Sequence, residues 1–498
     1  MRNNIGHTIS GTGLFLCAML LFLTVALGSG EVTAEAAEPE VPAEAYEYIA
    51  QQIHEHNPSI DMTRFNILLD SHGDCPEADY QARVIYGAVS DEYPDTFEAS
   101  TCTIDLREDG DNVYFGALNL DYVDGYDMEG FYAERDKALA VLEPGMSDLD
   151  KAIVLHDYLI AHTSYDFENF SSGVYNIRDN YNAYGVLYNK KGVCGGQAAA
   201  YKYLCNQAGV ECYLVNDQST EHVWNMVVID GEPYNVEITS DDPNWDLLGR
   251  VWHSSLLVTD EQIADELHTS AGKVTYFGRE LDLHATSKRF EKAFWKKCIS
   301  QITYHDGSFY YSMYIDKSPV RSEIQVISAA DVAENPARKG TKLAKESKYW
   351  HRENDPDDMF PMSSVLVAVR DGRVWFNTSD CFKSVAFDGS DERVEYAVDT
   401  AGKCICGAAV IDGQIYYTLG TSEFPQGPEE YIALSEDDRV YFEPTPTDTA
   451  SSATDAPDSG SSADGESGRL NVAIIAAAAS LLLVVIAVAV MAGRRKRR

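Results

Sequence analysis

The stretch from Lys191 to Gly209, KGVCGGQAAAYKYLCNQAG, does most to decide the fold of this 498-residue chain. From Gly196 to Ala208 its residues are good helix formers, and the final glycine ends the run. The predicted helix has an apolar face formed by Ala200, Tyr203 and Leu204. Cys194 therefore lies at or just before the first turn, where the partial positive charge of a helix N-terminus favours the nucleophilic thiolate form. The alternative of a small buried cysteine describes Cys205 better.

A second stretch, from Glu221 to Thr239, reads EHVWNMVVIDGEPYNVEIT. Its Asp-Gly pair at 230–231 stands between two β-rich runs, which predicts a two-residue hairpin. With that turn, His222 faces Thr239, and Glu237 is a diagonal neighbour of His222 on the same face of the sheet. Diagonal neighbours are about 7–8 Å apart, within reach of a glutamate side chain. The sequence therefore permits an interaction between His222 and Glu237.

These residues have the types that a thiol nucleophile needs. Cys194 would attack, His222 would act as its base, and Glu237 would orient the base. A single histidine in a strand is more often an ordinary half-buried residue. Spacing alone therefore supports the catalytic and the structural interpretation about equally.

Further motifs surround these residues. They are DLDKAIVLHDYL at 148–159, NAYGVL at 182–187, GVC at 192–194, HVWN at 222–225, YNVE at 234–237 and DDP at 241–243. Together they resemble the bacterial branch of the transglutaminase-like superfamily. The resemblance covers roughly residues 131–263, about a quarter of the chain.

The resemblance implies an α+β core with a papain-like arrangement, in which a helix carries the nucleophile and an adjoining antiparallel sheet carries the base and the acid. It implies Cys194 as nucleophile, His222 as base and Glu237 as orienting acid. The acid of this family is usually an aspartate. The family often has a bulky aromatic residue where Gln197 stands and a tryptophan where Ser240 stands, so the pocket wall is altered.

Composition and charge restrict the function further. The chain has 39 Lys+Arg against 79 Asp+Glu, a formal net charge of −40. Because such an acidic surface repels phosphate backbones, we expect no nucleic-acid partner. The length indicates about two to four domains.

Two apolar segments predict the cellular location. We expect a signal peptide over residues 1–36, with an apolar run from Gly13 to Leu27 and an A-x-A site at 34–36. We expect a transmembrane helix over residues 470–493, because 24 uncharged residues are long enough to span a bilayer. The basic residues 494–498 place the tail in the cytoplasm by the positive-inside rule. The protein is thus predicted to be a single-pass cell-membrane protein with an extracellular body.

The remaining segments complete the predicted domain organisation. Residues 37–126 form an N-terminal α+β cap and residues 127–263 the transglutaminase-like domain. Residues 264–443 form a β-rich domain with three Asp-Gly hairpins, either part of a propeller or an open β-sandwich. Residues 444–469, rich in Ser, Thr, Asp and Pro, form a disordered stalk.

Cysteine usage bears on oxidation and on metals. The predicted exported body has nine cysteines, so at least one thiol is free or bonded to another molecule, and Cys194 is the expected one. Pairing of the others stays open. The pairs Cys404/Cys406 and His54/His56 lack second pairs at ligand spacing, so no metal and no cofactor is predicted.

The function that these patterns favour is thiol-dependent acyl transfer or hydrolysis of an amide at the cell surface. The product would be a crosslink if an amine accepts the acyl group, and a cleaved amide if water does. The expected partners are an extracellular protein or cell-wall peptide substrate and the membrane. The alternative is a non-catalytic adhesion or scaffold protein that retains only the fold.

Overall fold

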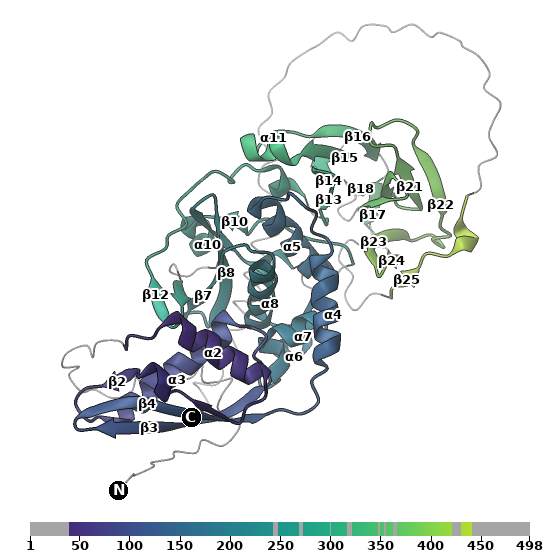
Figure 1. Ribbon diagram of the computed structural model, residues 1–498. Coiled ribbons are helices and arrows are strands. Elements are labelled where there is room, and N and C mark those ends of the chain that lie inside the picture. The colour runs from purple at the N-terminus through teal and green to yellow at the C-terminus, as the bar shows by residue number, and fades with distance from the viewer. Residues whose placement is uncertain are drawn as a thin grey trace, which may run out of the picture.

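The computed structural model describes residues 39–242, 248–267, 272–298, 300–315, 321–346, 349–352, 355–361, 366–420 and 430–440. Residues 1–36, 444–469, 470–493 and 494–498, the predicted signal peptide, stalk, transmembrane helix and tail, lie outside these ranges. Within the described ranges, no helix is long and apolar enough to cross a membrane. In Figure 1 an N-terminal unit, a central core and a β-rich region follow one another, which agrees with the predicted mixture of helices and strands.

The N-terminal unit packs two helices on a small antiparallel sheet. Its elements are α2 (Ala43–His54), β1 (Ser59–Asp61), η2 (Thr63–Phe65), β2 (Leu68–Asp70), α3 (Cys75–Glu92), β3 (Ala99–Asp109) and β4 (Asn112–Tyr122). Strand β4 pairs with β1, β2 and β3. The two helices bury residues such as Ile49 and Ile85 against Phe115, which gives this unit a hydrophobic core of its own.

The central core contains several helices, and most of them pack around the helix that begins at Cys194. They are α4 (Met128–Leu139), α5 (Asp148–His162), α6 (Phe167–Ser171), η3 (Arg178–Tyr181), α7 (Ala183–Leu187), α8 (Cys194–Gln207), α9 (Ile238–Asp241) and α10 (Asp260–Leu267). Helix α8 begins at Cys194, within the predicted first turn, and its predicted apolar face is buried. Gly209 follows it with a φ of +76°, a conformation that suits glycine after a helix end.

Six strands form the sheet on which α8 packs. They are β7 (Cys212–Asp217), β8 (His222–Ile229), β9 (Glu232–Val236), β10 (Leu256–Val258), β11 (Lys273–Tyr276) and β12 (Arg279–Leu281), in the order β10-β9-β8-β7-β11-β12. The predicted β8–β9 hairpin is confirmed, with positive φ at Asp230 and Gly231 and Val228 paired with Pro233. A two-stranded parallel pair, β5 (Ser164–Tyr165) and β6 (Lys191–Gly192), lies beside the start of α8.

One detail of the predicted hairpin is wrong. Its ladder ends at Asn225 and Val236, so His222 does not face Thr239. His222 is paired instead with Asp217 on β7. Beyond Val236 the backbone leaves the sheet and enters α9, because the Glu237 carboxylate accepts the N–H groups that open this helix.

The β-rich region consists of short antiparallel sheets. Its elements are η4 (Phe294–Lys297), β13 (Thr303–His305), β14 (Ser308–Ile315), β15 (Arg321–Ser328), α11 (Ala329–Glu334), β16 (Thr341–Glu346), β17 (Tyr349–Arg352), β18 (Asp355–Pro361), β19 (Val367–Arg370), β20 (Arg373–Asn377), β21 (Cys381–Val385), β22 (Arg393–Ala397), β23 (Cys404–Ile411), β24 (Gln414–Gly420), β25 (Ile432–Ala433) and η5 (Glu436–Asp438). The predicted hairpins are present as β13–β14, β19–β20 and β23–β24. Within the described strands of this region, each sheet follows chain order, as in propeller blades, whereas a sandwich pairs distant strands.

Both outer regions are attached to the core through buried contacts. Glu92, at the end of α3, accepts a hydrogen bond of 2.7 Å from Lys202 of α8, and the Lys202 side chain is fully buried. On the other side, the main hydrophobic cluster runs without a break from α5 and α8 to Trp295, Phe309 and Tyr311. The hydrophobic core of the central unit therefore includes residues that follow α10 in the chain.

Candidate active site

Cys194 is the first residue of α8, and 8% of it is exposed. The chain before it is held by a hydrogen bond of 2.8 Å from Val193 N–H to the Asn180 carbonyl. Gly196 lets α8 approach that same carbonyl, since a Cβ at 196 would lie 2.4 Å from the Asn180 oxygen. Gly196, two residues after the nucleophile, is thus needed for close packing at the helix start.

The first turn of α8 receives no side-chain cap from the residue before it. Val193 occupies the capping position in an extended conformation, and its apolar side chain accepts no hydrogen bond from the helix. The first N–H groups of a helix have no partner within the helix. Beside Cys194 they are available to an oxygen atom of a bound molecule.

His222 opens β8, with 17% of its side chain exposed. Its Nε2 lies 3.3 Å from Oε1 of Glu237, an ion-pair distance without the angle of a hydrogen bond. Cys194 also interacts with the ring of His222. Burial alone would lower the pKa of His222, but the charges of Glu237 and of the Cys194 thiolate raise it well above its usual value. The ring therefore favours its protonated form.

Glu237 joins β9 to α9 and is buried. Its carboxylate accepts hydrogen bonds from the N–H groups of Thr239 at 2.9 Å and Ser240 at 2.6 Å, so it caps the helix. Burial would raise the pKa of Glu237, but the charge of His222 and the Ser240 hydrogen bonds outweigh burial and lower it. Glu237 is thus a fixed negative charge behind His222, and the structure brings all three predicted residues together.

Two tyrosines form part of the surroundings of the thiol. Tyr165 ends β5 and Tyr181 ends η3, beside the first turn of α8. Burial raises the pKa of both hydroxyls, and the charge of Cys194 raises it further. From Tyr165 an edge-to-face series of rings continues through Phe170 to the exposed Tyr175. Aromatic side chains therefore extend from the neighbourhood of Cys194 to the surface.

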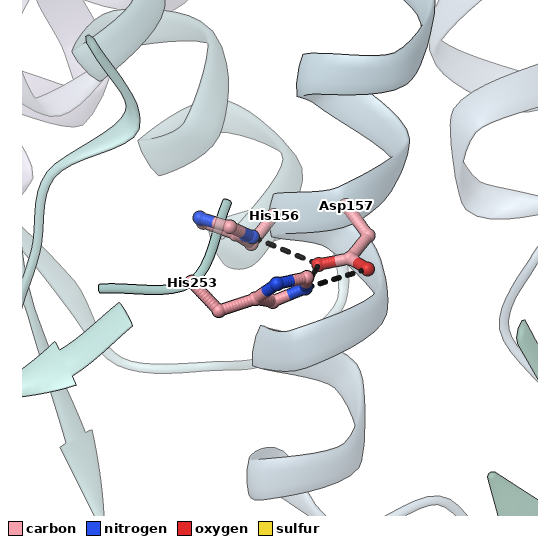
Figure 2. Close-up of side chains that lie close together, drawn as sticks. All are labelled: His156, Asp157 and His253. Carbon is pink, nitrogen blue, oxygen red and sulfur yellow. Dashed lines mark hydrogen bonds and ion pairs between the residues drawn. The ribbon is translucent and has the colours of Figure 1, made fainter. Parts of the chain in front are cut away.

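A second histidine–carboxylate cluster lies in the same core, as Figure 2 shows. His156 and Asp157 come from α5 and His253 from the loop before β10, and all three side chains are fully buried. Both rings point at Asp157: His156 Nδ1 lies 2.9 Å and His253 Nε2 3.0 Å from its Oδ1. Their other nitrogens, His156 Nε2 and His253 Nδ1, contact Asp241 at 3.2 Å and the Cys298 carbonyl at 3.0 Å. We call these four residues, His156, Asp157, Asp241 and His253, the closed cluster.

The spacing of the closed cluster resembles that of a metal site, since one ligand atom from each of His156, Asp157 and His253 lies within 4.8 Å of the others. Hydrogen bonding accounts for the same atoms. Every ring nitrogen faces an oxygen acceptor, so two doubly protonated rings would satisfy two carboxylates with no net charge. Burial lowers the pKa of His156, but Asp157 and Asp241 raise it to about 9. We therefore interpret the closed cluster as an ion network.

Sequence reasoning missed the closed cluster. His156 and Asp157 belong to a quoted motif, and Asp241 to another, but neither was given a role. The available signal was the adjacent His-Asp pair in a helix that is otherwise apolar on that side. His253 carries no local signal, because its partner Asp157 is 96 residues away.

Several cysteines besides Cys194 carry free thiols. Cys75, Cys194, Cys205, Cys212, Cys298 and Cys404 are free thiols in the structure. Burial raises the pKa of Cys205 well above its usual value, as expected for a structural thiol inside the helix. The expectation that Cys194 carries a free thiol is confirmed.

The transglutaminase-like superfamily matches residues 135–237. No curated protein sequence matches the chain. A solved structure described as that of a TGase is 15% identical with a TM-score of 0.21, over 31% of this chain and 48% of the other. The arylamine N-acetyltransferase (BACCR)NAT3 from Bacillus cereus, described as having a Cys-His-Glu triad, is 10% identical with a TM-score of 0.18, over 55% and 94%.

These two structural similarities are too low to carry an argument, and the chain spans about half the length of the first. The match to the family runs from within α4 to Glu237, one residue beyond β9, and therefore includes Cys194, His222 and Glu237. Residues 135–237 therefore form a transglutaminase-like core.

Proposed function

We propose that this protein is a thiol-dependent enzyme that acylates Cys194 with the carbonyl group of an amide and passes the acyl group to an amine or to water. The observation that carries the proposal is the placement of His222 between Cys194 and the buried Glu237. A raised pKa of His222 favours a thiolate–imidazolium pair at neutral pH, which is the reactive form of a cysteine nucleophile.

The first chemical step is attack of the Cys194 thiolate on the amide carbon. A C–S bond forms, and the carbonyl oxygen takes the negative charge next to the N–H groups that open α8. The intermediate collapses as the C–N bond breaks. His222 gives its Nδ1 proton to the leaving amine, which departs neutral and leaves a thioester on Cys194.

The second step regenerates the thiol group. Neutral His222 takes a proton from the incoming amine or water, which attacks the thioester carbon, and the Cys194 thiolate leaves. Glu237 stays ionised throughout and holds the ring through Nε2. An amine gives a crosslinked or transferred product, and water gives amidase or peptidase activity.

Alkylation of the purified full-length chain tests the proposal. We expect iodoacetamide to label Cys194 quickly at pH 6, and His222→Ala to slow this labelling strongly. Cys75, a partly exposed thiol on α3 far along the chain from the site, is the internal reference and should label equally in both proteins. Equal labelling of Cys194 in both proteins would contradict the proposal and favour a non-catalytic scaffold.

We propose that the substrate is an extracellular protein or a cell-wall peptide and that the body lies outside the cell. The support is the sequence alone: the predicted signal peptide, stalk and transmembrane helix. Protease treatment of intact cells should release the body by cutting within residues 444–469. Recovery of an uncut full-length chain after this treatment would contradict the location.

A further inference from the structure

We propose that Gln197 is a positioning residue that ties α9 to α8 and thereby holds Glu237 in place relative to Cys194. This inference rests on the proposed function. Gln197 stands where the related family often has a bulky aromatic residue. It lies one turn after Cys194 and is fully buried.

The side-chain amide of Gln197 contacts both ends of α9. Its Oε1 accepts a hydrogen bond of 2.8 Å from the Thr239 hydroxyl, in the first turn of α9. Its Nε2 donates a hydrogen bond of 2.7 Å to Oδ2 of Asp242, the residue that caps the C-terminal end. One side chain on the nucleophile helix therefore bridges α9 from start to end.

Helix α9 needs such external support. It has only four residues, and its C-terminal end closes with a hydrogen bond of 2.9 Å from the Asp242 N–H to the Ile238 carbonyl. So short a helix is not stable by itself. Its opening N–H groups fix both oxygens of Glu237, so a displaced α9 would move the carboxylate away from His222.

Glutamine fits this position because it offers one acceptor and one donor. The acceptor meets a hydroxyl and the donor meets a carboxylate. A glutamate at 197 would place a second carboxylate against Asp242, and a methionine of similar length would lose both hydrogen bonds. Neither replacement could reproduce the bridge.

A separate anchor limits the damage that loss of Gln197 would cause. Asp241 of α9 contacts His156 and accepts hydrogen bonds from the Ser254 hydroxyl and the Ser255 N–H. Because this anchor remains, we expect α9 to shift and not to unfold. Loss of Gln197 should thus affect the site more than the stability of the chain.

The experiment is the pH dependence of Cys194 alkylation in the full-length chain. In a cysteine–histidine pair the lower inflection reports formation of the ion pair and the upper one loss of the imidazolium proton. Gln197→Met should move the upper inflection to lower pH, because His222 loses the nearby charge of Glu237. It should also slow labelling at pH 7 about 10- to 100-fold, as expected for an ångström-scale misplacement.

Two variants keep the test decisive. In the double variant Gln197→Glu/Asp242→Asn, the side chain at 242 donates and the side chain at 197 accepts, the reverse of the wild-type hydrogen bond. We expect its pH profile to match the wild type more closely than the profile of Asp242→Asn alone. If Gln197→Met does not fold, Thr239→Val removes only one of the two hydrogen bonds and should move the inflection in the same direction.

The outcomes separate the two proposals. A wild-type protein with two inflections and a Gln197→Met profile identical to it would overturn the positioning role and leave the proposed function intact. A wild-type protein with one inflection, typical of an isolated thiol, would overturn the proposed function and the positioning role with it.

Discussion

Two histidine–carboxylate clusters lie in the same core, and they differ in how fully the histidine ring nitrogens are hydrogen-bonded. In the closed cluster each of the four ring nitrogens faces an oxygen acceptor, and no side chain is exposed. At the site of Cys194, His222 has one ring nitrogen in a loose ion pair with Glu237, also interacts with Cys194, and is partly exposed. Histidine and carboxylate side chains thus stabilise the fold in the closed cluster, where every ring proton is held by an acceptor. At the site of Cys194 they permit chemistry, because His222 can release a proton.

Helix α9 connects the two clusters. Glu237, at its start, belongs to the site of Cys194, and Asp241, at its end, belongs to the closed cluster. A rigid cluster at one end of a four-residue helix therefore supports the acid at the other end.

The largest expected effects are those of Cys194→Ala and His222→Ala on chemistry. Cys194→Ala should abolish acyl-enzyme formation with an amide or a thiol-directed probe. His222→Ala should lower its rate by about 10²- to 10⁴-fold, the usual contribution of a general acid–base group. Mass spectrometry of the intact chain measures the adduct. Neither variant should change the melting temperature much, because Cys194→Ala removes a single sulfur atom and Glu237 keeps its hydrogen bonds from the Thr239 and Ser240 N–H groups when His222 is lost.

The second effect is that of His156→Ala on stability. This substitution would leave the buried Asp241 without a histidine partner and Asp157 with His253 alone, and breaking a buried ion pair from one side costs about 3–5 kcal/mol. The free energy of unfolding is measured by denaturant titration, with His222→Ala as the matched control. Equal unfolding midpoints for the two variants would show that the clusters do not differ as described.

Glu237→Asp sharpens the comparison at α9. Aspartate can still cap the helix, but the carboxylate would withdraw from His222 by one methylene. We expect the acylation rate to fall by up to about 10²-fold, as for other small misplacements. The measurement is the rate of adduct formation on Cys194. An unchanged or higher rate would mean that the site tolerates the acid usual in the family.

Glu266 offers a smaller, pH-dependent effect beside the closed cluster. Burial and then the charge of Asp241 raise its pKa to about 7, although it accepts a hydrogen bond from Ser255. A raised pKa means that the folded state binds the proton more tightly, so stability is lost as pH rises from about 4.5 to about 7. Glu266→Gln should therefore raise the melting temperature at pH 8 and change it little at pH 4. A gain at pH 4 alone would contradict this sign.

The smallest expected effect is that of a chelator. If the closed cluster is an ion network, EDTA should leave the melting temperature unchanged and elemental analysis should find no stoichiometric divalent metal. A bound ion whose removal lowers the melting temperature would identify His156, Asp157 and His253 as ligands. The contrast between the two clusters would then have to be drawn differently.

Much of the site could be predicted because its signals are local. The helix start at Cys194 follows from glycines and helix formers, and the β8–β9 turn follows from Asp230-Gly231. The end of that hairpin could not be predicted from strand register. Strand pairing competed there with capping of α9 by Glu237, and the two N–H hydrogen bonds prevailed.

The closed cluster and the Gln197 bridge lay beyond such reasoning. Asp157 meets His253 and the Ile302 N–H, 96 and 145 residues away. Gln197 reaches Thr239 and Asp242 across more than 40 residues. Single-sequence patterns report neighbours within an element or a hairpin, whereas these contacts depend on how separate elements pack.

The buried pair of Lys202 and Glu92 has a consequence for the size of the folding unit. Lys202 lies on the helix that begins with Cys194, and its fully buried ammonium is neutralised by a residue of the N-terminal unit. A chain trimmed to residues 135–237 would keep the lysine and lose the carboxylate. At about 3–5 kcal/mol for a broken buried pair, such a fragment would give up much of the stability typical of a whole domain.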